Sequence, residues 1–167
     1  MKDYLVTNID ESIEKVLGNL LLQKNKTMCT AESCTGGYIA HLITLIPGSS
    51  NYFYGSIVSY DNTIKENILQ VKKETLQQFG AVSEETVIEM ARGVLKLMQT
   101  DYAIAVSGIM GPDGGSKEKP VGTVWIAVGN DQKIETKKLW FRFDRKRNIE
   151  LTSINALNML RLFLREK

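Results

Sequence analysis

The chain has 167 residues, about the length of one domain, and its 43% hydrophobic and 24% charged residues are close to the averages of globular proteins. Its net charge of +2 is too small for a module that binds nucleic acid or a membrane surface through charge alone. Two cysteines make no disulfide framework, and a single histidine argues against most zinc sites and most Ser-His catalytic pairs. We therefore expect one domain over residues 1–167, in the cytoplasm, with no metal site.

The first part of the chain alternates between helix and strand patterns. Helices are expected over residues 9–21, 38–46 and 62–69, and strands over residues 27–32 and 53–60. Asn8 and Glu11 can form a capping box at the start of the first helix. Residues 33–60 carry no charged side chain, but a Pro-Gly turn interrupts them before any apolar run is long enough to span a membrane.

The second part of the chain continues this alternation and ends in a hairpin and a helix. Helices are expected over residues 73–78 and 84–98, strands over 102–106, 122–128 and 133–143, and a last helix with inward residues from Ile149 to Leu164. Ser83 is placed to cap the helix that follows it. The sequence therefore predicts an α/β fold, a three-layer domain with a mixed, mostly parallel sheet and a C-terminal β-hairpin plus helix.

Three unusual segments follow predicted strands, at residues 32–37, 60–65 and 107–115. In an open α/β sheet the ligand crevice lies beyond the carboxyl ends of the strands, so we expect the three segments to meet there. Ser33 stands at a strand-to-helix turn before two glycines, where a hydroxyl can be a nucleophile beside amides that hold an oxyanion. The alternative is that Ser33 or Thr35 only caps the following helix.

A serine nucleophile needs a base, and His41 lies too far into the next helix to face Ser33. Lys65 is the better candidate, because burial in a pocket can lower the pKa of a lysine until it accepts a proton. Tyr60 could relay that proton or donate one to the leaving group. The competing interpretation is a solvated lysine and a packed aromatic ring. Cys34 would be the nucleophile of a thiol enzyme if it were ionised, but a lone buried thiol is more often inert.

Two further features are suited to an anion. The glycine-rich segment 108–115 would let backbone N–H groups approach a phosphate, although it matches neither a Walker loop nor a dinucleotide-binding fingerprint. Arg145, just before the last helix, could clamp a phosphate with its forked guanidinium. A turn-rich surface loop and a solvated arginine are the alternatives, and the residues alone leave both pairs open.

Several motifs occur together along the chain, in one order and spacing. They are Thr30-Ala31-Glu32-Ser33-Cys34-Thr35-Gly36-Gly37, Pro47-Gly48-Ser49-Ser50, Tyr60-Asp61-Asn62 with Lys65, Gly80-Ala81-Val82-Ser83, Ser107-Gly108-Ile109 with Gly111-Pro112-Asp113-Gly114-Gly115, and Lys119-Pro120-Val121-Gly122-Thr123-Val124. Through them the chain resembles the CinA C-terminal domain family from about residue 9 to its end. The resemblance implies an α/β domain that hydrolyses the carboxamide of nicotinamide mononucleotide to nicotinate mononucleotide and ammonia, without a metal or cofactor.

The resemblance also implies which residues act. The catalytic serine, tyrosine and lysine of the family fall on Ser33, Tyr60 and Lys65. The residues expected to bind the substrate are Thr35, Gly36, Gly37, Ser50, Ser107, Gly108, Gly111 and Arg145. Backbone N–H groups near Gly36 would hold the oxyanion, and the 107–115 loop, Ser50 and Arg145 would hold the ribose phosphate.

Some features depart from the family pattern. Met110 stands where the family usually has a small residue, and Ile149 stands where it commonly has a second arginine. Full-length CinA proteins carry a further N-terminal domain, which we do not expect here. A non-catalytic nucleotide-binding or regulatory module is the alternative function. The expected partner is a small-molecule nucleotide, with neither nucleic acid nor membrane, and apolar outer helix faces suggest a homodimer or higher homo-oligomer.

Overall fold

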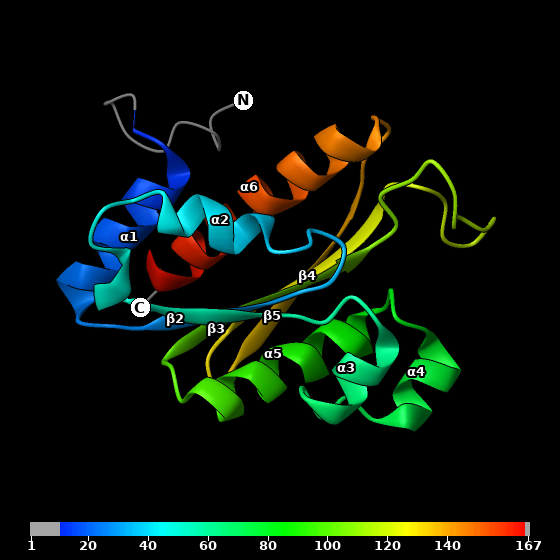
Figure 1. The fold of residues 1–167 in the computed structure, drawn as a ribbon, viewed down its shortest axis with the longest axis horizontal. Helices are drawn as coiled ribbons and strands as arrows, with labels where there is room; N and C mark the ends of the chain where they lie inside the picture. Colours follow the sequence, from blue (N-terminus) through cyan, green and yellow to red (C-terminus); the bar gives the residue numbers. More distant parts are fainter. Residues whose placement is uncertain (1–10, 166–167) are drawn as a thin grey trace.

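A computed structural model describes residues 11–165 of the chain as three layers. Figure 1 shows α1, α2 and α6 over one face of a five-stranded sheet, and α3, α4 and α5 over the other. The elements are α1 (Ile13–Lys24), β1 (Met28–Glu32), α2 (Tyr38–Thr44), the short 3-10 helix η2 (Ser49–Asn51), β2 (Phe53–Val58), α3 (Asn62–Asn67), α4 (Lys73–Phe79), α5 (Glu84–Met98), β3 (Tyr102–Gly108), β4 (Thr123–Gly129), β5 (Ile134–Trp140) and α6 (Arg145–Arg165). The expected three-layer α/β fold is confirmed.

The sheet is mixed, with the strand order β2-β1-β3-β4-β5. β1 pairs in parallel with both β2 and β3, whereas β4 is antiparallel to β3 and to β5. The strands β1, β2 and β3 therefore end on the same side, with Glu32 beside Val58 and Val106. We call this side the carboxyl end of the sheet and the opposite side the amino end.

The two faces of the central strands bury side chains of different size. Large side chains such as Met28, Ile104 and Val106 pack under α1, α2 and α6. Small ones such as Ala31 and Ala105 face α5 and the residues around it. Small residues let a helix approach the sheet closely, while both faces of β1 and β3 stay buried. This explains why the central strand reads as a continuous apolar run in the sequence.

Element ends differ from the sequence-based expectations at a few positions. β3 extends to Gly108, two residues beyond the predicted end, because Ser107 and Gly108 still pair with β4. Arg145 is the first residue of α6 rather than the residue before it. The predicted cap at Ser83 is confirmed, since its side chain accepts the Thr86 amide, and Asp61 caps α3 in the same way through the Thr63 amide. The expected capping box at Asn8 falls outside the described residues.

Candidate active site

A cavity of about 200 Å³ opens at the carboxyl end of the sheet. Six of the residues expected at the site line it, and they are Ser33, Tyr60, Lys65, Ser107, Gly108 and Arg145. They come from the turn after β1, the segment from Tyr60 into α3, the end of β3 and the start of α6. The expectation that these segments meet at one place is therefore met by the fold. Within residues 11–165, no cluster of His, Cys, Asp and Glu side chains is able to hold a metal ion.

Ser33 is the first residue after β1, in the turn before α2. Its backbone N–H donates to the Val106 carbonyl at 3.0 Å, which ties the turn to β3. The residue is 8% exposed, and its hydroxyl makes no hydrogen bond to any other part of the described chain. In the described chain the completely buried hydroxyls without a partner are those of Tyr52 and Ser59, so the unbonded Ser33 hydroxyl is instead open to the cavity. The side chain is thus available to a ligand in the cavity.

Lys65 lies on α3 and is only 1% exposed. Its Nζ donates to the Ser59 carbonyl at 2.6 Å and, more weakly, to the Tyr60 carbonyl at 3.4 Å. Burial lowers the pKa of this amine, while the Asp61 carboxylate nearby opposes that shift. The interpretation of Lys65 as a solvated lysine is therefore wrong. No hydrogen bond joins Lys65 to Ser33 in the described chain, although both line the cavity.

Tyr60 and Arg145 form a second pair at the mouth of the cavity. The Tyr60 side chain is not packed as the alternative interpretation held, since the residue is 62% exposed. Its phenol accepts a hydrogen bond of 2.8 Å from Arg145 Nη2, and Arg145 Nη1 donates to the Gly111 carbonyl at 2.8 Å. The phenol is therefore turned to Arg145, and only the carbonyl of Tyr60 contacts Lys65. Arg145 is exposed but held at two points.

The start of α2 differs from the expectation that Ser33 or Thr35 caps it. The N-cap residue is Gly37, and the amide groups of Gly37, Ile39 and Ala40 donate to the buried Glu32 carboxylate instead. The Thr35 hydroxyl also donates to this carboxylate, at 2.6 Å. The capping group is thus a long side chain that precedes the turn and reaches over it.

This arrangement limits which amides can stabilise an oxyanion. Gly36 N–H donates to the Ser33 carbonyl at 3.1 Å, and Gly37 N–H is taken by Glu32. The amides expected near Gly36 are therefore already bonded. In the described part of the chain, the amides of Cys34 and Thr35 make no hydrogen bond to another residue, so these two can point to a ligand.

The glycine-rich segment is not a simple phosphate cradle. Its first residues belong to β3, and the Ser107 hydroxyl donates to the Ala81 carbonyl at 2.7 Å. Ile109 N–H donates to the Thr123 carbonyl. Residues 112–118 are exposed, and in Figure 1 the loop extends away from the sheet. Gly111 contributes a carbonyl that holds Arg145, and a carbonyl cannot itself bind phosphate.

The remaining expected residues lie outside the cavity. Thr35, Gly36 and Gly37 line an adjoining hollow of about 610 Å³, and Arg145 belongs to both spaces. Ser50 lies in η2, just before β2 begins, and therefore at the amino end of the sheet. The structure does not bring Ser50 to Ser33 within one chain, because Ser50 precedes β2 and Ser33 follows the parallel strand β1, at opposite ends of the sheet.

The family model of the CinA C-terminal domain matches residues 10–164. The chain belongs to the CinA family. CinA-like proteins of Cytophaga hutchinsonii and Endomicrobium trichonymphae are 49% and 51% identical to it, over 93% and 96% of this chain. The match covers only 37% and 38% of those two proteins, so this chain spans about two fifths of their length.

Solved structures of the same superfamily share this fold. A CinA superfamily protein from Klebsiella pneumoniae has a TM-score of 0.89 at 33% identity, with 94% of this chain and 100% of that chain covered. The competence/damage inducible protein CihA from Agrobacterium tumefaciens has a TM-score of 0.85 at 36% identity, with 95% and 99% covered. The family and the arrangement of its strands and helices are thus established for this chain.

Sequence reasoning about this CinA domain gave no role to Glu32 and did not single out Asn148. Asn148 is fully buried in α6, and its amide group donates to the carbonyls of Met110 and Phe143 at 3.1 and 3.0 Å. It thereby fixes the loop that carries Met110 and Gly111 to the helix that carries Arg145. The available sequence signal was a polar residue on the inward face of an otherwise apolar helix, since such a residue needs a partner.

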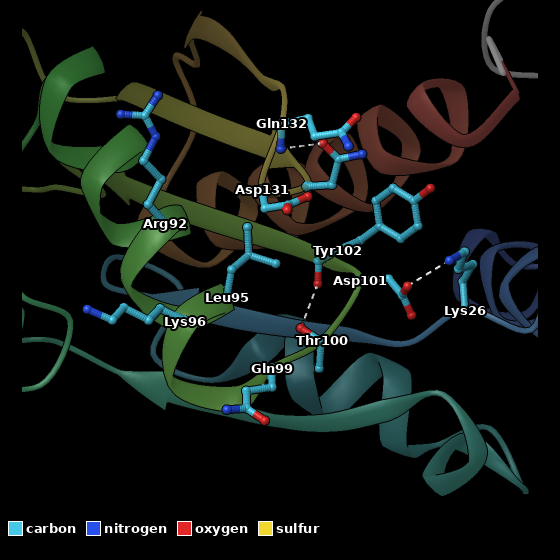
Figure 2. A pocket seen from close by; sticks show the side chains of 11 residues that line it. Lys26, Arg92, Leu95, Lys96, Gln99, Thr100, Asp101, Tyr102, Asp131 and Gln132 are labelled. Carbon is cyan, nitrogen blue, oxygen red and sulfur yellow. Dashed lines mark hydrogen bonds and ion pairs between the residues drawn. The ribbon is translucent and has the colours of Figure 1, made fainter.

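A larger cavity, of about 670 Å³, lies at the amino end of this CinA domain and was not anticipated. Figure 2 shows Lys26 turned to Asp101, while Arg92 and Lys96 extend away from that pair. The Thr100 hydroxyl donates to the Tyr102 carbonyl at 3.1 Å. Neither Ser nor Cys side chains line this space. Lys26, Thr100 and Asp101 are hydrogen-bonded, and the cations Arg92 and Lys96 do not converge on one point with Lys26.

No helix within residues 11–165 combines the length and the apolar character needed to cross a bilayer.

Proposed function

We propose that this CinA domain is an amidohydrolase that converts nicotinamide mononucleotide to nicotinate mononucleotide and ammonia, with Ser33 as the nucleophile. One observation carries the proposal. A hydroxyl without a partner and a buried lysine of lowered pKa face one cavity at the carboxyl end of the sheet. Such a pair suits covalent catalysis, because the amine can accept the serine proton when it is neutral.

The reaction would proceed in two stages. Ser33 Oγ attacks the carboxamide carbon while its proton passes to the neutral Lys65 amine, and a tetrahedral oxyanion forms. The amides of Cys34 and Thr35, which donate to no other residue of the described chain, would hold that oxyanion. The carbon–nitrogen bond then breaks, Lys65 returns the proton to the departing nitrogen, and ammonia leaves an ester on Ser33. Water attacks this ester with Lys65 as base, which releases the carboxylic acid and restores the serine.

The two adjoining spaces suit the two halves of this substrate. The smaller cavity takes the pyridine ring and its carboxamide, and the hollow beyond Arg145 takes the ribose phosphate. The Arg145 guanidinium stands between them and offers a planar fork to the phosphate. Because the Tyr60 phenol is bonded to Arg145, we assign Tyr60 to substrate contact rather than to proton transfer.

The test is ammonia release from a panel of pyridine compounds. The intact protein is expected to act on nicotinamide mononucleotide, and much less on nicotinamide riboside or nicotinamide, because both lack the phosphate whose binding positions the carboxamide. Ser33→Ala is expected to lower turnover by more than about 10³-fold. A chelator should have no effect. Full turnover by the Ser33→Ala variant would refute the serine mechanism.

A second candidate function is binding without turnover. The absence of a hydrogen bond between Ser33 and Lys65 in the described chain favours it, as does the apolar Ile149 in the phosphate hollow. In that case nicotinamide mononucleotide would raise the melting temperature while no ammonia appeared. A thiol enzyme is disfavoured, because burial raises the pKa of Cys34 to about 12 and so suppresses the thiolate.

A further inference from the structure

Glu32 is a carboxylate that the proposed reaction leaves without a role. It is the last residue of β1 and is completely buried. No lysine, arginine or histidine of residues 11–165 forms an ion pair with it. Burial of an unpaired carboxylate is costly unless hydrogen bonds replace its hydration. The surroundings of Glu32 therefore need an explanation.

Six hydrogen bonds replace that hydration, three to each oxygen. Oε1 accepts from Ala40 N–H at 2.8 Å and from the Thr30 and Ser56 hydroxyls at 3.2 and 3.3 Å. Oε2 accepts from the Thr35 hydroxyl at 2.6 Å, from Ile39 N–H at 3.0 Å and from Gly37 N–H at 3.1 Å. The donors belong to β1, β2, the turn after β1 and α2.

These bonds enclose the turn that carries the nucleophile. Residues 33–36 leave Glu32 and return to its carboxylate through Thr35 and Gly37. At the other end of the turn, Ser33 N–H is fixed to β3. The same carboxylate occupies the amides at the start of α2, so that only the amides of Cys34 and Thr35 stay open to a ligand.

We infer that Glu32 is a positioning residue for the reaction: its buried carboxylate fixes the 33–36 turn so that Ser33 and Cys34 line the Lys65 cavity, with Thr35 beside them at the adjoining hollow. The inference rests on the proposed function. A residue that only capped α2 would affect stability, whereas a positioning residue also affects the rate at which bound substrate reacts. A displacement of about 1 Å at a reacting group can lower a rate by about 10²-fold.

The test compares Glu32→Gln with Asp101→Asn in the full chain. Glutamine keeps the length of the side chain, but its amide nitrogen must face donors that need an acceptor. We expect kcat to fall about 10- to 100-fold while KM changes less than about threefold, because Arg145, which would bind the phosphate, is held by Tyr60 and Gly111 and not by Glu32. Asp101 is the matched control, since it also accepts backbone and side-chain hydrogen bonds, but at the amino end. Asp101→Asn should leave kcat unchanged.

A second measurement does not depend on turnover. Hydrogen exchange at the amides of Gly37, Ile39 and Ala40 should accelerate at least about tenfold in Glu32→Gln, while the amides of α5 keep their protection. If the intact protein releases no ammonia, the proposed function fails, and this measurement still tests the local role of Glu32. Unchanged kcat or unchanged exchange at these amides would overturn the inference.

Thr35→Val covers the case in which Glu32→Gln does not fold. This variant keeps the carboxylate and removes its shortest hydrogen bond. We expect the same two changes as in Glu32→Gln but of smaller magnitude, with faster hydrogen exchange at Gly37 and a kcat lowered by about 3- to 10-fold. A folded Thr35→Val protein with intact kcat and intact exchange would contradict the inference as well.

Discussion

The two ends of the sheet carry two different kinds of cavity. The amino-end cavity is the larger, at about 670 Å³ against about 200 Å³. Yet its Asp101 carboxylate accepts from Lys26 and Thr27, and its Thr100 hydroxyl is also bonded. At the carboxyl end, the Ser33 hydroxyl has no hydrogen-bond partner, and Lys65 Nζ is bonded only to carbonyl oxygens in the described chain.

This difference indicates that volume alone does not identify a reactive site. Polar groups that satisfy one another stabilise a fold and have nothing left to offer a ligand. Buried polar groups that lack a matching partner are unfavourable for stability and are found where a protein binds or reacts. Matched substitutions at the two ends of the sheet test this difference.

The largest effect is expected from the two lysines. Lys65→Met removes the base and should lower amidase turnover by about 10²- to 10⁴-fold. The fold should be at least as stable as before, because methionine fills the buried position without a charge to desolvate. Lys26→Met at the amino end is the control and should leave turnover unchanged. Steady-state kinetics and thermal unfolding of both variants test this, and an active Lys65→Met protein would remove the distinction between the two ends.

A smaller effect is expected from the two arginines. Arg145→Lys replaces a planar fork that holds Tyr60 and Gly111 with a single ammonium. We expect KM for nicotinamide mononucleotide to rise about 10-fold with a smaller change in kcat, because a charged hydrogen bond is lost in binding. Arg92→Lys, at the amino-end cavity, should change neither constant. Equal effects of both substitutions would mean that the amino-end cavity also binds the nucleotide.

The fold was accessible from the sequence because its periodicities are local. Several local features depend only on neighbours along the chain. They are the small and large residues of β1 and β3, the caps at Asp61 and Ser83, and the glycine turns. The meeting of Ser33, Lys65 and Ser107 followed from the rule for the carboxyl ends of parallel strands, whereas that rule does not place Arg145.

The features of the site that the sequence did not predict depend on contacts between segments that are distant along the chain. The cap of α2 is Glu32, and part of its support comes from Ser56, 24 residues away. Tyr60 faces Arg145 across 85 residues of chain, and no spacing rule gives that hydrogen bond. Such contacts are set by how the layers pack, which local patterns do not contain.

The smallest predicted effect is on the pH dependence of the free energy of unfolding, to which Lys65 and Asp101 contribute at opposite ends of the pH range. Burial lowers the pKa of Lys65, so the folded state releases its proton before the unfolded state does. Between that lowered pKa and the ordinary value of 10.5, the unfolded chain binds more protons, and stability contributed at this site should rise with pH. Lys65→Met should lack this rise in urea unfolding measured across the alkaline range.

Asp101 should respond at the acid side. Its burial raises the pKa, but hydrogen bonds from Lys26 and Thr27 outweigh this and lower it below the ordinary 3.8. Its stabilisation is therefore present above pH 3.8 and lost as the pH falls through the lowered value. At neutral pH, Asp101→Asn should cost about 0.5–1 kcal/mol, because the carboxylate is one third exposed and partly screened. The gap between the intact and variant proteins should close in acid, and a gap that widened there would show that the paired groups at the amino end do not stabilise the fold as their geometry indicates.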